Sequence, residues 1–416
     1  MAGAPGYFLT AAQAAAALGV TRATLYAYAS RRQLRSQAVG GTSRERRYYR
    51  EDIDRLKERR SARRDPAGAA ARGLHWGGPV LESGITLIHD GRLFYRGRDV
   101  EELAKTMTAE EVATLLWTPA DQKSDDVPPR MFEQPCPLPQ TQLTAVRRAA
   151  RDRITRLQAA LPLAASIDLA ASDLRAPAVR LTGARILRLM TAVLANHDAR
   201  QPLHRALQTA WAPRRPAVAE VIRTALVLCS DHELNVSAFT ARCAASAGAS
   251  PYDVVSAALA TFKGFKHGGA AARVLEMALH AATLKRARAT IAEQLRAGHT
   301  VPGFGHPLYP NGDPRGRILL QMAESSGNAR SWEPFRHLVR AGAEVLQDAP
   351  NLDCGLAAIT RTFALPDDAP AVLFATGRTI GWIAHALEEY ASGELIRPRA
   401  RYTGPFPTNV TPAPTV

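Results

Sequence analysis

Apolar residues recur every three or four positions through most of the chain beyond Gln142, and this spacing predicts amphipathic helices. We expect helices over residues 142–160, 178–196, 216–229, 235–248, 251–263, 269–283, 286–297, 315–326, 334–346, 354–364 and 371–391. The body of the protein is therefore predicted to be mainly α-helical.

One earlier stretch alternates apolar and polar residues instead. Residues 85–99, ITLIHDGRLFYRGRD, alternate on both sides of Asp90-Gly91, a dipeptide that favours a tight turn between strands. We expect a β-hairpin there, as the main β element of the body. The proline-rich stretch 118–140 that follows is predicted to be a surface loop.

The first 65 residues show short helices separated by turns. Thr10 is expected to cap a helix that ends near Leu18, and Thr21 to cap a second helix, Arg22 to Ser30. This order of helix, short turn and helix is typical of a helix-turn-helix. Beyond it, residues 37–42 are turn-like, residues 44–50 are expected to form the return strand of a wing, and residues 52–64 a charged helix.

The distribution of charge supports a separate N-terminal module. The formal net charge is +15, and residues 1–65 hold 13 Arg and one Lys against six acidic residues, whereas the rest of the chain holds 39 basic and 32 acidic residues. A basic skew at one end predicts a module that contacts nucleic acid phosphates. The residues that we expect to contact double-stranded DNA are Arg22, Tyr26, Arg31, Arg32, Arg44, Arg46 and Arg47. A small helical module whose arginines are merely solvated, or which mediates protein contacts, stays open.

Composition excludes several classes of protein. With 46% hydrophobic and 22% charged residues, the chain is an ordinary globular protein. The four cysteines lack CxxC spacing, so we expect neither a metal site nor a disulfide framework. No apolar run approaches the roughly 20 residues of a membrane helix. The N-terminus lacks a secretory signal pattern, so we expect a cytoplasmic protein without membrane contact.

Three stretches place a histidine at a polar or glycine-rich helix boundary. They read SDHELN over residues 230–235, FKGFKHGGA over 262–270 and VPGFGHPLYPNGDPR over 301–315. Glycines after His267 allow a ligand to come close, and the proline-rich third loop rigidly presents His306 and Arg315. Taken singly, each histidine has a structural explanation, such as a surface position for His232 in a first helical turn behind an N-cap.

Taken together, the three stretches resemble the citrate synthase family in order and wording. The hairpin and the stretches NLD (351–353), GRTIGWIAH (377–385) and IRPRARY (396–402) agree with that family as well, so the resemblance spans residues 80–405. Residues 7–57 resemble the winged helix-turn-helix of MerR and excisionase-like proteins.

The resemblance implies that acetyl-CoA, a co-substrate and not a permanently bound cofactor, condenses with oxaloacetate to give citrate and CoA. In that reaction Asp353 is the general base, His267 hydrogen-bonds the thioester oxygen, and His306 polarises the oxaloacetate carbonyl. The implied oxaloacetate-binding residues are His232, Arg315, Arg378 and Arg397, the last reaching the partner's site in a homodimer.

Two departures leave the acyl-CoA partner open. The stretch 306–310 reads HPLYP where many bacterial members read HRVYK, which removes two cations that can face CoA phosphates. After His267-Gly-Gly the chain reads AAAR where members read ANE, so Arg273, Lys263 and Lys266 are candidate replacements. Another acyl-CoA and the reverse lyase reaction on citryl-CoA therefore stay open. So does a transcriptional regulator whose pocket senses a dicarboxylate, citrate or a CoA ester.

The architecture that the resemblance implies is a two-domain helical fold behind a winged head. We expect the head over residues 1–65, a linker over 66–79, a large domain over 80–229 and 335–416, and a small domain over 230–334. The site is expected in the cleft between the large and small domains.

Overall fold

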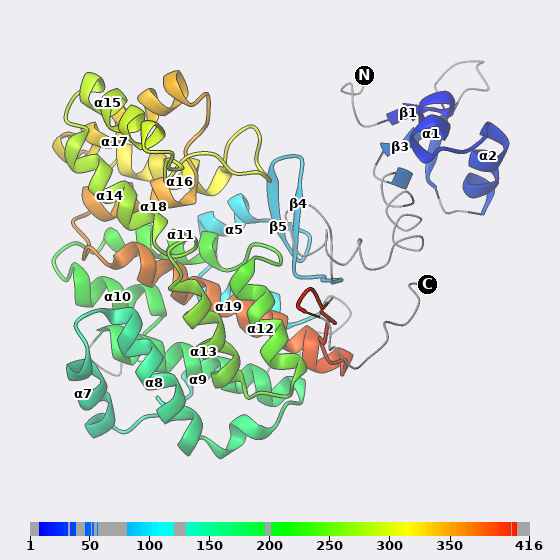
Figure 1. Cartoon of the computed structure of the whole chain (residues 1–416). Coiled ribbons are helices and arrows are strands. Elements are labelled where there is room, and N and C mark those ends of the chain that lie inside the picture. The colour runs from blue at the N-terminus through cyan, green and yellow to red at the C-terminus, as the bar shows by residue number, and fades with distance from the viewer. Residues whose placement is uncertain are drawn as a thin grey trace. The chain divides into compact units, whose positions relative to one another are not determined.

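The structure is a computed structural model, and it describes residues 8–31, 34–38, 46–50, 52–53, 56, 81–119, 130–195, 201–400 and 402–405. The chain divides into two compact units, Met1–Glu82 and Ser83–Val416, and each is described by itself (Figure 1). The predicted linker over residues 66–79 and most of the charged helix predicted over 52–64 lie outside the described residues.

The N-terminal unit is a helix-turn-helix with a small sheet. Its elements are β1 (Phe8–Thr10), α1 (Ala11–Leu18), α2 (Arg22–Ser30), β2 (Ser36–Ala38) and β3 (Arg46–Tyr49), and the antiparallel sheet has the order β1-β3-β2. The predicted caps are confirmed, because the Thr10 side chain accepts from Gln13 N and the Thr21 side chain from Thr24 N. Gly19 ends α1 in the left-handed conformation, which glycine adopts without strain. Leu25, Tyr48 and Ile53 are among the buried residues of its separate small core.

The second unit begins with the predicted hairpin. Strands β4 (Thr86–His89) and β5 (Arg92–Tyr95) pair antiparallel, with His89 opposite Arg92, and β6 (Arg98–Asp99) extends the sheet. Asp90 and Gly91 both have positive φ, as a two-residue hairpin turn requires. The hairpin prediction is therefore confirmed.

The rest of this unit is helical, as predicted. The helices are α5 (Val100–Thr106), α6 (Ala109–Trp117), α7 (Gln140–Ala149), α8 (Arg153–Ile167), α9 (Ala176–Ala195), α10 (Leu203–Trp211), α11 (Val218–Cys229), α12 (Val236–Ser246), α13 (Pro251–Phe262), α14 (Ala270–His280), α15 (Leu284–Arg296), α16 (Pro314–Glu324), α17 (Ala329–Val345), α18 (Leu352–Thr362) and α19 (Ala369–Ser392).

Two details differ from the helix predictions. The single helix expected over 142–160 is two helices, because Ala150 is extended and Asp152 starts α8 as an N-cap that accepts from Thr155 N. Helices α5, α6 and α10 were not predicted, although the apolar residues of α10 lie on one face. The loop predicted over 118–140 is described only at its ends, and residues 131–133 form one turn of 3-10 helix.

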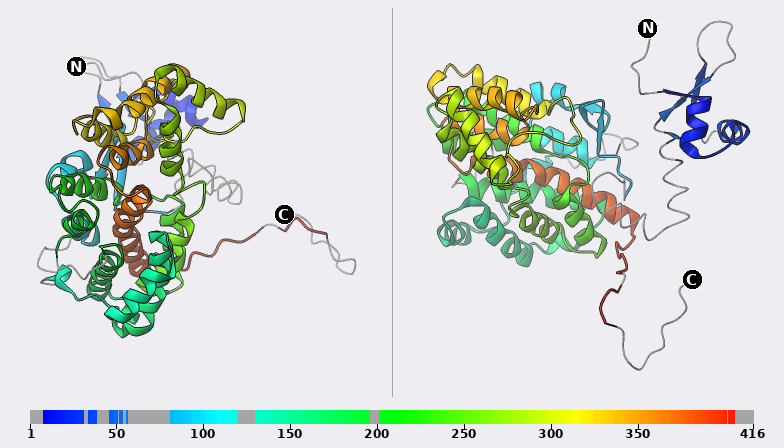
Figure 2. Two further views of the ribbon diagram at one scale, coloured as in Figure 1. Left: turned by 90° about the vertical axis from the view of Figure 1, so that its left-hand side faces the viewer. Right: turned by 45° about the horizontal axis from the view of Figure 1, so that its top comes forward.

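The long helix α19 organises the unit, because it packs against α6, α9, α11, α12 and α13. Helices α14 to α18 pack against one another and gather at the opposite end from α7 and α8 (Figures 1 and 2). By this packing α12 and α13 group with α8 and α19, whereas α17 and α18 group with α14 to α16. The helices that pack together, α14 to α18, cover about residues 270–362. The small domain over residues 230–334 stays a prediction.

Candidate active site

Six of the seven residues expected to bind or convert substrate lie on elements that meet within the second unit. They are His232 after α11, His267 before α14, His306 in the loop before α16, Arg315 in the first turn of α16, Asp353 in the first turn of α18, and Arg378 within α19. Contacts of α16 with α11 and α18, of α14 with α18, and of α19 with α11, α14 and α18 bring these segments together. Arg397 is exposed on the extended segment after α19, outside this cluster.

His232 is a buried residue of the site and not a surface residue of a helix. Its side chain is only 7% exposed, and the N-cap of the following helix is Asn235. His232 Nε2 lies 2.9 Å from the hydroxyl of Tyr309, and its ring centroid lies 5.0 Å from that of His306. Burial, helped by the Arg315 cation, holds the pKa of His232 well below 6.5, so the ring is neutral.

The loop that carries His306 is held in place by backbone pairing. Gly305 N donates to Ala349 O at 2.9 Å and Asn351 N donates to Gly303 O at 2.9 Å, so the loop runs along the segment that leads into α18. His306 Nδ1 accepts from Leu308 N at 3.2 Å. Burial and the Arg315 cation lower the pKa of His306 to about 4, so the neutral ring carries its proton on Nε2 and can donate it.

Two buried guanidinium groups lie beside the histidines. Arg315 forms a two-pronged ion pair with Asp313, through contacts of 2.9 and 2.8 Å, and Asp313 also accepts from Leu352 N. Arg378 is 1% exposed, and its Nε donates to Cys229 O at 2.8 Å. Its Nη2 has no hydrogen-bond partner among the described residues. Because a buried unpaired donor is costly, a ligand oxygen at this point would be stabilised.

His267 is held by a short series of polar contacts at its Nε2 atom. Its Nε2 lies 2.9 Å from Ser237 Oγ, which also accepts from Trp382 Nε1 at 3.2 Å. Burial, with a smaller effect from the Arg378 cation, lowers the pKa of His267 to about 4, so this ring is neutral too. The Ser237 hydroxyl donates to Asn235 Oδ1 at 2.8 Å. When that proton turns to His267 Nε2 instead, the ring proton lies on Nδ1, where it is available to a ligand.

Asp353 is the second residue of α18 and does not cap it. The N-cap is Asn351, whose side chain accepts from Asp353 N at 3.0 Å. Burial raises the pKa of Asp353 to about 6, against the opposing effects of Arg315 and Arg273. A carboxylate with a raised pKa is a stronger base than an ordinary one, as proton abstraction requires.

A second layer of buried ionisable residues, which the sequence did not single out, lies behind His232. Asp231 Oδ1 is 3.3 Å from His385 Nε2, and the Thr86 hydroxyl donates to Asp231 Oδ2 at 2.6 Å. Arg242 Nε donates to His385 Nδ1 at 3.0 Å, and its Nη1 to Glu389 at 3.0 Å. Asp231 lies within the stretch SDHELN and His385 within GRTIGWIAH, so the available signal was their place beside His232 and Arg378. Tyr309, within the stretch 301–315, was likewise not predicted to belong to the site.

The candidate DNA contacts are exposed wherever the structure describes them. Arg22 and Tyr26 lie on α2, Arg31 directly after it, and Arg46 and Arg47 on β3. Tyr26 is 50% exposed although it is aromatic. The remaining two candidates, Arg32 and Arg44, lie outside the described residues.

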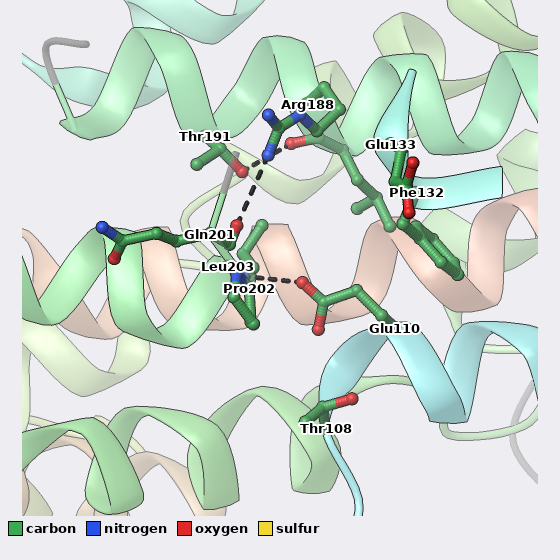
Figure 3. A pocket seen from close by; sticks show the side chains of 10 residues that line it. Thr108, Glu110, Phe132, Glu133, Arg188, Thr191, Gln201, Pro202 and Leu203 are labelled. Atoms are coloured by element: carbon green, nitrogen blue, oxygen red, sulfur yellow. Dashed lines mark hydrogen bonds between the residues drawn. The ribbon is translucent and has the colours of Figure 1, made fainter. Parts of the chain in front are cut away.

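A pocket elsewhere in the second unit contains none of the predicted site residues. Figure 3 shows a pocket of about 250 Å³ in which Leu203 N donates to Glu110 Oε1 at 2.6 Å and Arg188 Nη1 to Gln201 O at 3.4 Å. None of the predicted site residues lines it. Within the described ranges no group of His, Cys, Asp and Glu suited to a metal ion is present. No helix in those ranges is both long enough and apolar enough to cross a membrane.

Comparison with known proteins identifies the family of each part of the chain. Residues 73–399 match the model of the citrate synthase C-terminal domain, and residues 8–61 match a helix-turn-helix domain. The chain is 28% identical to citrate synthase 2 of Bacillus subtilis, over 81% of this chain and 96% of that protein. It is 31% identical to the citrate synthase of Haloferax volcanii, over 83% of this chain and 99% of that protein.

Solved structures share the fold. The citrate synthase of Thermotoga maritima matches with a TM-score of 0.68 at 24% identity, over 81% of this chain and 96% of that chain. The citrate synthase of Thermoplasma acidophilum, solved in a ternary complex with carboxymethyl coenzyme A and oxaloacetate, matches with a TM-score of 0.67 at 24% identity, over 82% and 98%. The chain therefore belongs to the citrate synthase family and carries a helix-turn-helix domain at its N-terminus.

Proposed function

We propose that this protein condenses acetyl-CoA with oxaloacetate to give citrate and CoA. The observation that supports this most directly is the arrangement of the site. A carboxylate with a raised pKa and two neutral imidazoles lie around two buried guanidinium groups, one of which has an unpartnered donor. The Thermoplasma acidophilum relative binds oxaloacetate and a CoA analogue, which agrees with the same pair of ligands here.

In the first step Asp353 removes a proton from the methyl group of acetyl-CoA. The resulting enolate is stabilised by a hydrogen bond from His267 to the thioester oxygen. A neutral His267 can donate from Nδ1 when its Nε2 accepts from Ser237, 2.9 Å away, and this tautomer requires the Ser237 hydroxyl proton to turn from Asn235 Oδ1 to His267.

In the second step the carbon nucleophile attacks the oxaloacetate carbonyl. His306 donates from Nε2 to that oxygen and protonates the alkoxide that forms, and water then hydrolyses the citryl thioester to release CoA. Arg315, Arg378 and His232 bind the two carboxylates of oxaloacetate, since guanidinium groups donate paired hydrogen bonds to carboxylates. The positive charge of the buried Arg315 and Arg378 guanidinium groups favours the binding of a dianion.

A homodimer completes the site in this proposal, because Arg397 of one chain serves the partner's site. Its exposure on an extended segment away from the cluster supports such a role. Mixing the inactive variants Asp353→Asn and Arg397→Gln tests it. With random exchange, one intact site forms in each mixed dimer, and about one quarter of the activity returns. No recovery after verified subunit exchange means that Arg397 does not act across the interface.

Release of CoA thiol from acetyl-CoA and oxaloacetate tests the reaction, with citrate identified as the product. Asp353→Asn should lower kcat by about 100- to 10,000-fold, the usual contribution of a general base. Glu293→Gln on the exposed face of α15 is the matched control and should leave kcat unchanged. A wild-type protein that binds citrate tightly but releases no CoA would contradict the proposal. Other acyl-CoA substrates are measured in the same assay, whereas the citryl-CoA lyase direction releases no thiol and is measured as oxaloacetate formed from citryl-CoA.

The helix-turn-helix domain favours a second function, binding to double-stranded DNA. The five described candidate contacts are all exposed on α2, directly after it or on β3. Duplex affinity should fall steeply with salt, because phosphate contacts release counterions. Deleting residues 1–65 should abolish binding, and affinity that survives the deletion would refute the assignment. A change of DNA affinity with oxaloacetate or citrate, without turnover, would identify a regulator instead of an enzyme.

A further inference from the structure

Lys263 and Lys266, two candidate cations for binding an acyl-CoA, already contact other side chains, which makes them less available to a ligand. Lys263 Nζ donates to Thr155 Oγ1 at 3.2 Å and to Gln158 Oε1 at 2.9 Å, so this cation is held against α8. Lys266 Nζ lies 5.9 Å from the centroid of the exposed Phe265 ring, in the loop before α14. Neither contact involves Asp353, the proposed general base.

Arg273 differs from both lysines. It is exposed on α14, and none of the residues that the structure describes forms a hydrogen bond or an ion pair with its guanidinium. It lies six residues after His267, within the stretch AAAR that departs from the family pattern. The cation is therefore available to a ligand.

Packing around one glycine brings the first turns of α14 and α18 close together. A Cβ atom built on Gly303 would lie 2.6 Å from Val274 Cγ2 and 3.3 Å from Cys354 Cβ, so both residues flank this glycine. Arg273 and Asp353 are the residues directly before these two, each in an early turn of its helix. The guanidinium is close enough to lower the pKa of Asp353, against the larger effect of burial.

We propose that Arg273 binds an anionic group of the acyl-CoA whose carbon Asp353 deprotonates. This inference rests on the proposed condensation and adds a residue that decides which thioester is accepted. Two parts of an acyl-CoA have the required chemistry, the phosphates of CoA and a carboxylate carried by a dicarboxylic acyl chain. A guanidinium binds either through paired hydrogen bonds.

Binding measurements test this without depending on turnover. Calorimetry with oxaloacetate present compares CoA, acetyl-pantetheine and malonyl-CoA on the wild type, Arg273→Gln and Arg273→Lys. If Arg273 binds phosphate, Arg273→Gln weakens CoA by about tenfold or more and leaves acetyl-pantetheine unchanged. If it binds an acyl carboxylate, the variant weakens malonyl-CoA by a similar factor and leaves CoA unchanged.

Arg296→Gln, at the exposed end of α15, is the matched control and should change none of these affinities. Arg273→Lys should recover part of the lost affinity because it keeps the charge without the planar fork. Unchanged affinity of Arg273→Gln for both CoA and malonyl-CoA would overturn the inference. Absence of CoA release by the wild type would refute the condensation instead, and the two failures are thus distinguishable.

Discussion

His232 Nε2 and the Tyr309 hydroxyl lie 2.9 Å apart, and this contact joins the loop after α11 to the loop that carries His306. Both side chains are buried, and the Arg315 guanidinium carbon lies 5.5 Å from the centroid of the Tyr309 ring. Tyr309 therefore orients a histidine that we expect to bind oxaloacetate.

Replacing Tyr309 with Phe should raise KM for oxaloacetate by about three- to tenfold. The reason is that one neutral hydrogen bond contributes about 1 kcal/mol, while the ring still fills its place. Steady-state kinetics at saturating acyl-CoA measure this, and Tyr390→Phe, whose hydroxyl donates to Ala249 O far along the chain, is the control. An unchanged KM would mean that the contact does not position His232.

The activity should fall as the pH decreases through about 6. Burial raises the pKa of Asp353 to about 6, and the base is inactive once it takes up a proton. His267 and His306, with pKa values lowered to about 4, stay neutral over this range and do not contribute. The pH dependence of kcat/KM measures the acidic limb. Arg273→Gln should move this limb to higher pH, because Arg273 lowers the pKa of Asp353. A limb near pH 4 would contradict the assignment to Asp353.

The buried Asp353 carboxylate should lower the free energy of unfolding at neutral pH. A folded-state pKa of about 6 exceeds the ordinary value of 3.8, so the folded state holds its proton more tightly than the unfolded state does. Stability from this group is complete below pH 3.8 and is lost as the pH rises through 6. Asp353→Asn should therefore raise the free energy of unfolding at pH 8 by up to about 3 kcal/mol, with a smaller gain at pH 5. Chemical denaturation at both pH values measures the difference, and an equal gain at both would refute this account.

Oxaloacetate should protect the protein against heat through Arg378. Its buried Nη2 has no partner among the described residues, and a substrate carboxylate would satisfy it. At a concentration 100 times Kd, ligand binding stabilises by about 2.7 kcal/mol, which corresponds to a rise of a few degrees in Tm. Arg378→Gln should abolish this rise. Thermal melts with and without oxaloacetate measure it, and protection that persists in the variant would place the carboxylate elsewhere.

Breaking the buried pair of Asp231 and His385 should destabilise the fold. Both side chains are fully buried, and His385, after the opposing effect of burial, contributes most to lowering the pKa of Asp231. His385→Ala leaves that carboxylate without the ring nitrogen that faces its Oδ1, and we expect a loss of about 1 to 3 kcal/mol. Asp231→Asn should cost less, because no unpaired charge remains. Denaturant titrations compare the two, and equal losses would argue against an electrostatic cause.

Much of the fold follows from local patterns in the sequence. The caps at Thr10 and Thr21, the turn at Asp90-Gly91 and the periodic apolar positions of α11 to α19 each depend on residues that are near one another in the chain. Such signals lie within one or two turns, so they are readable without the tertiary structure. The break at Asp152 was missed because the apolar spacing continues across it.

The residues proposed to carry the chemistry can be named from the sequence, because the histidine, arginine and aspartate stretches resemble a known family in order and wording. The burial of His232, the contacts of Tyr309 and Ser237 with two of the histidines, and the approach of Asp231 to His385 arise from helix packing. The partners in these contacts are 30 to 154 residues apart in the chain, so no local pattern encodes them. Burial and neighbouring charge, which set the pKa values of Asp353, His267 and His306, arise only when the helices pack.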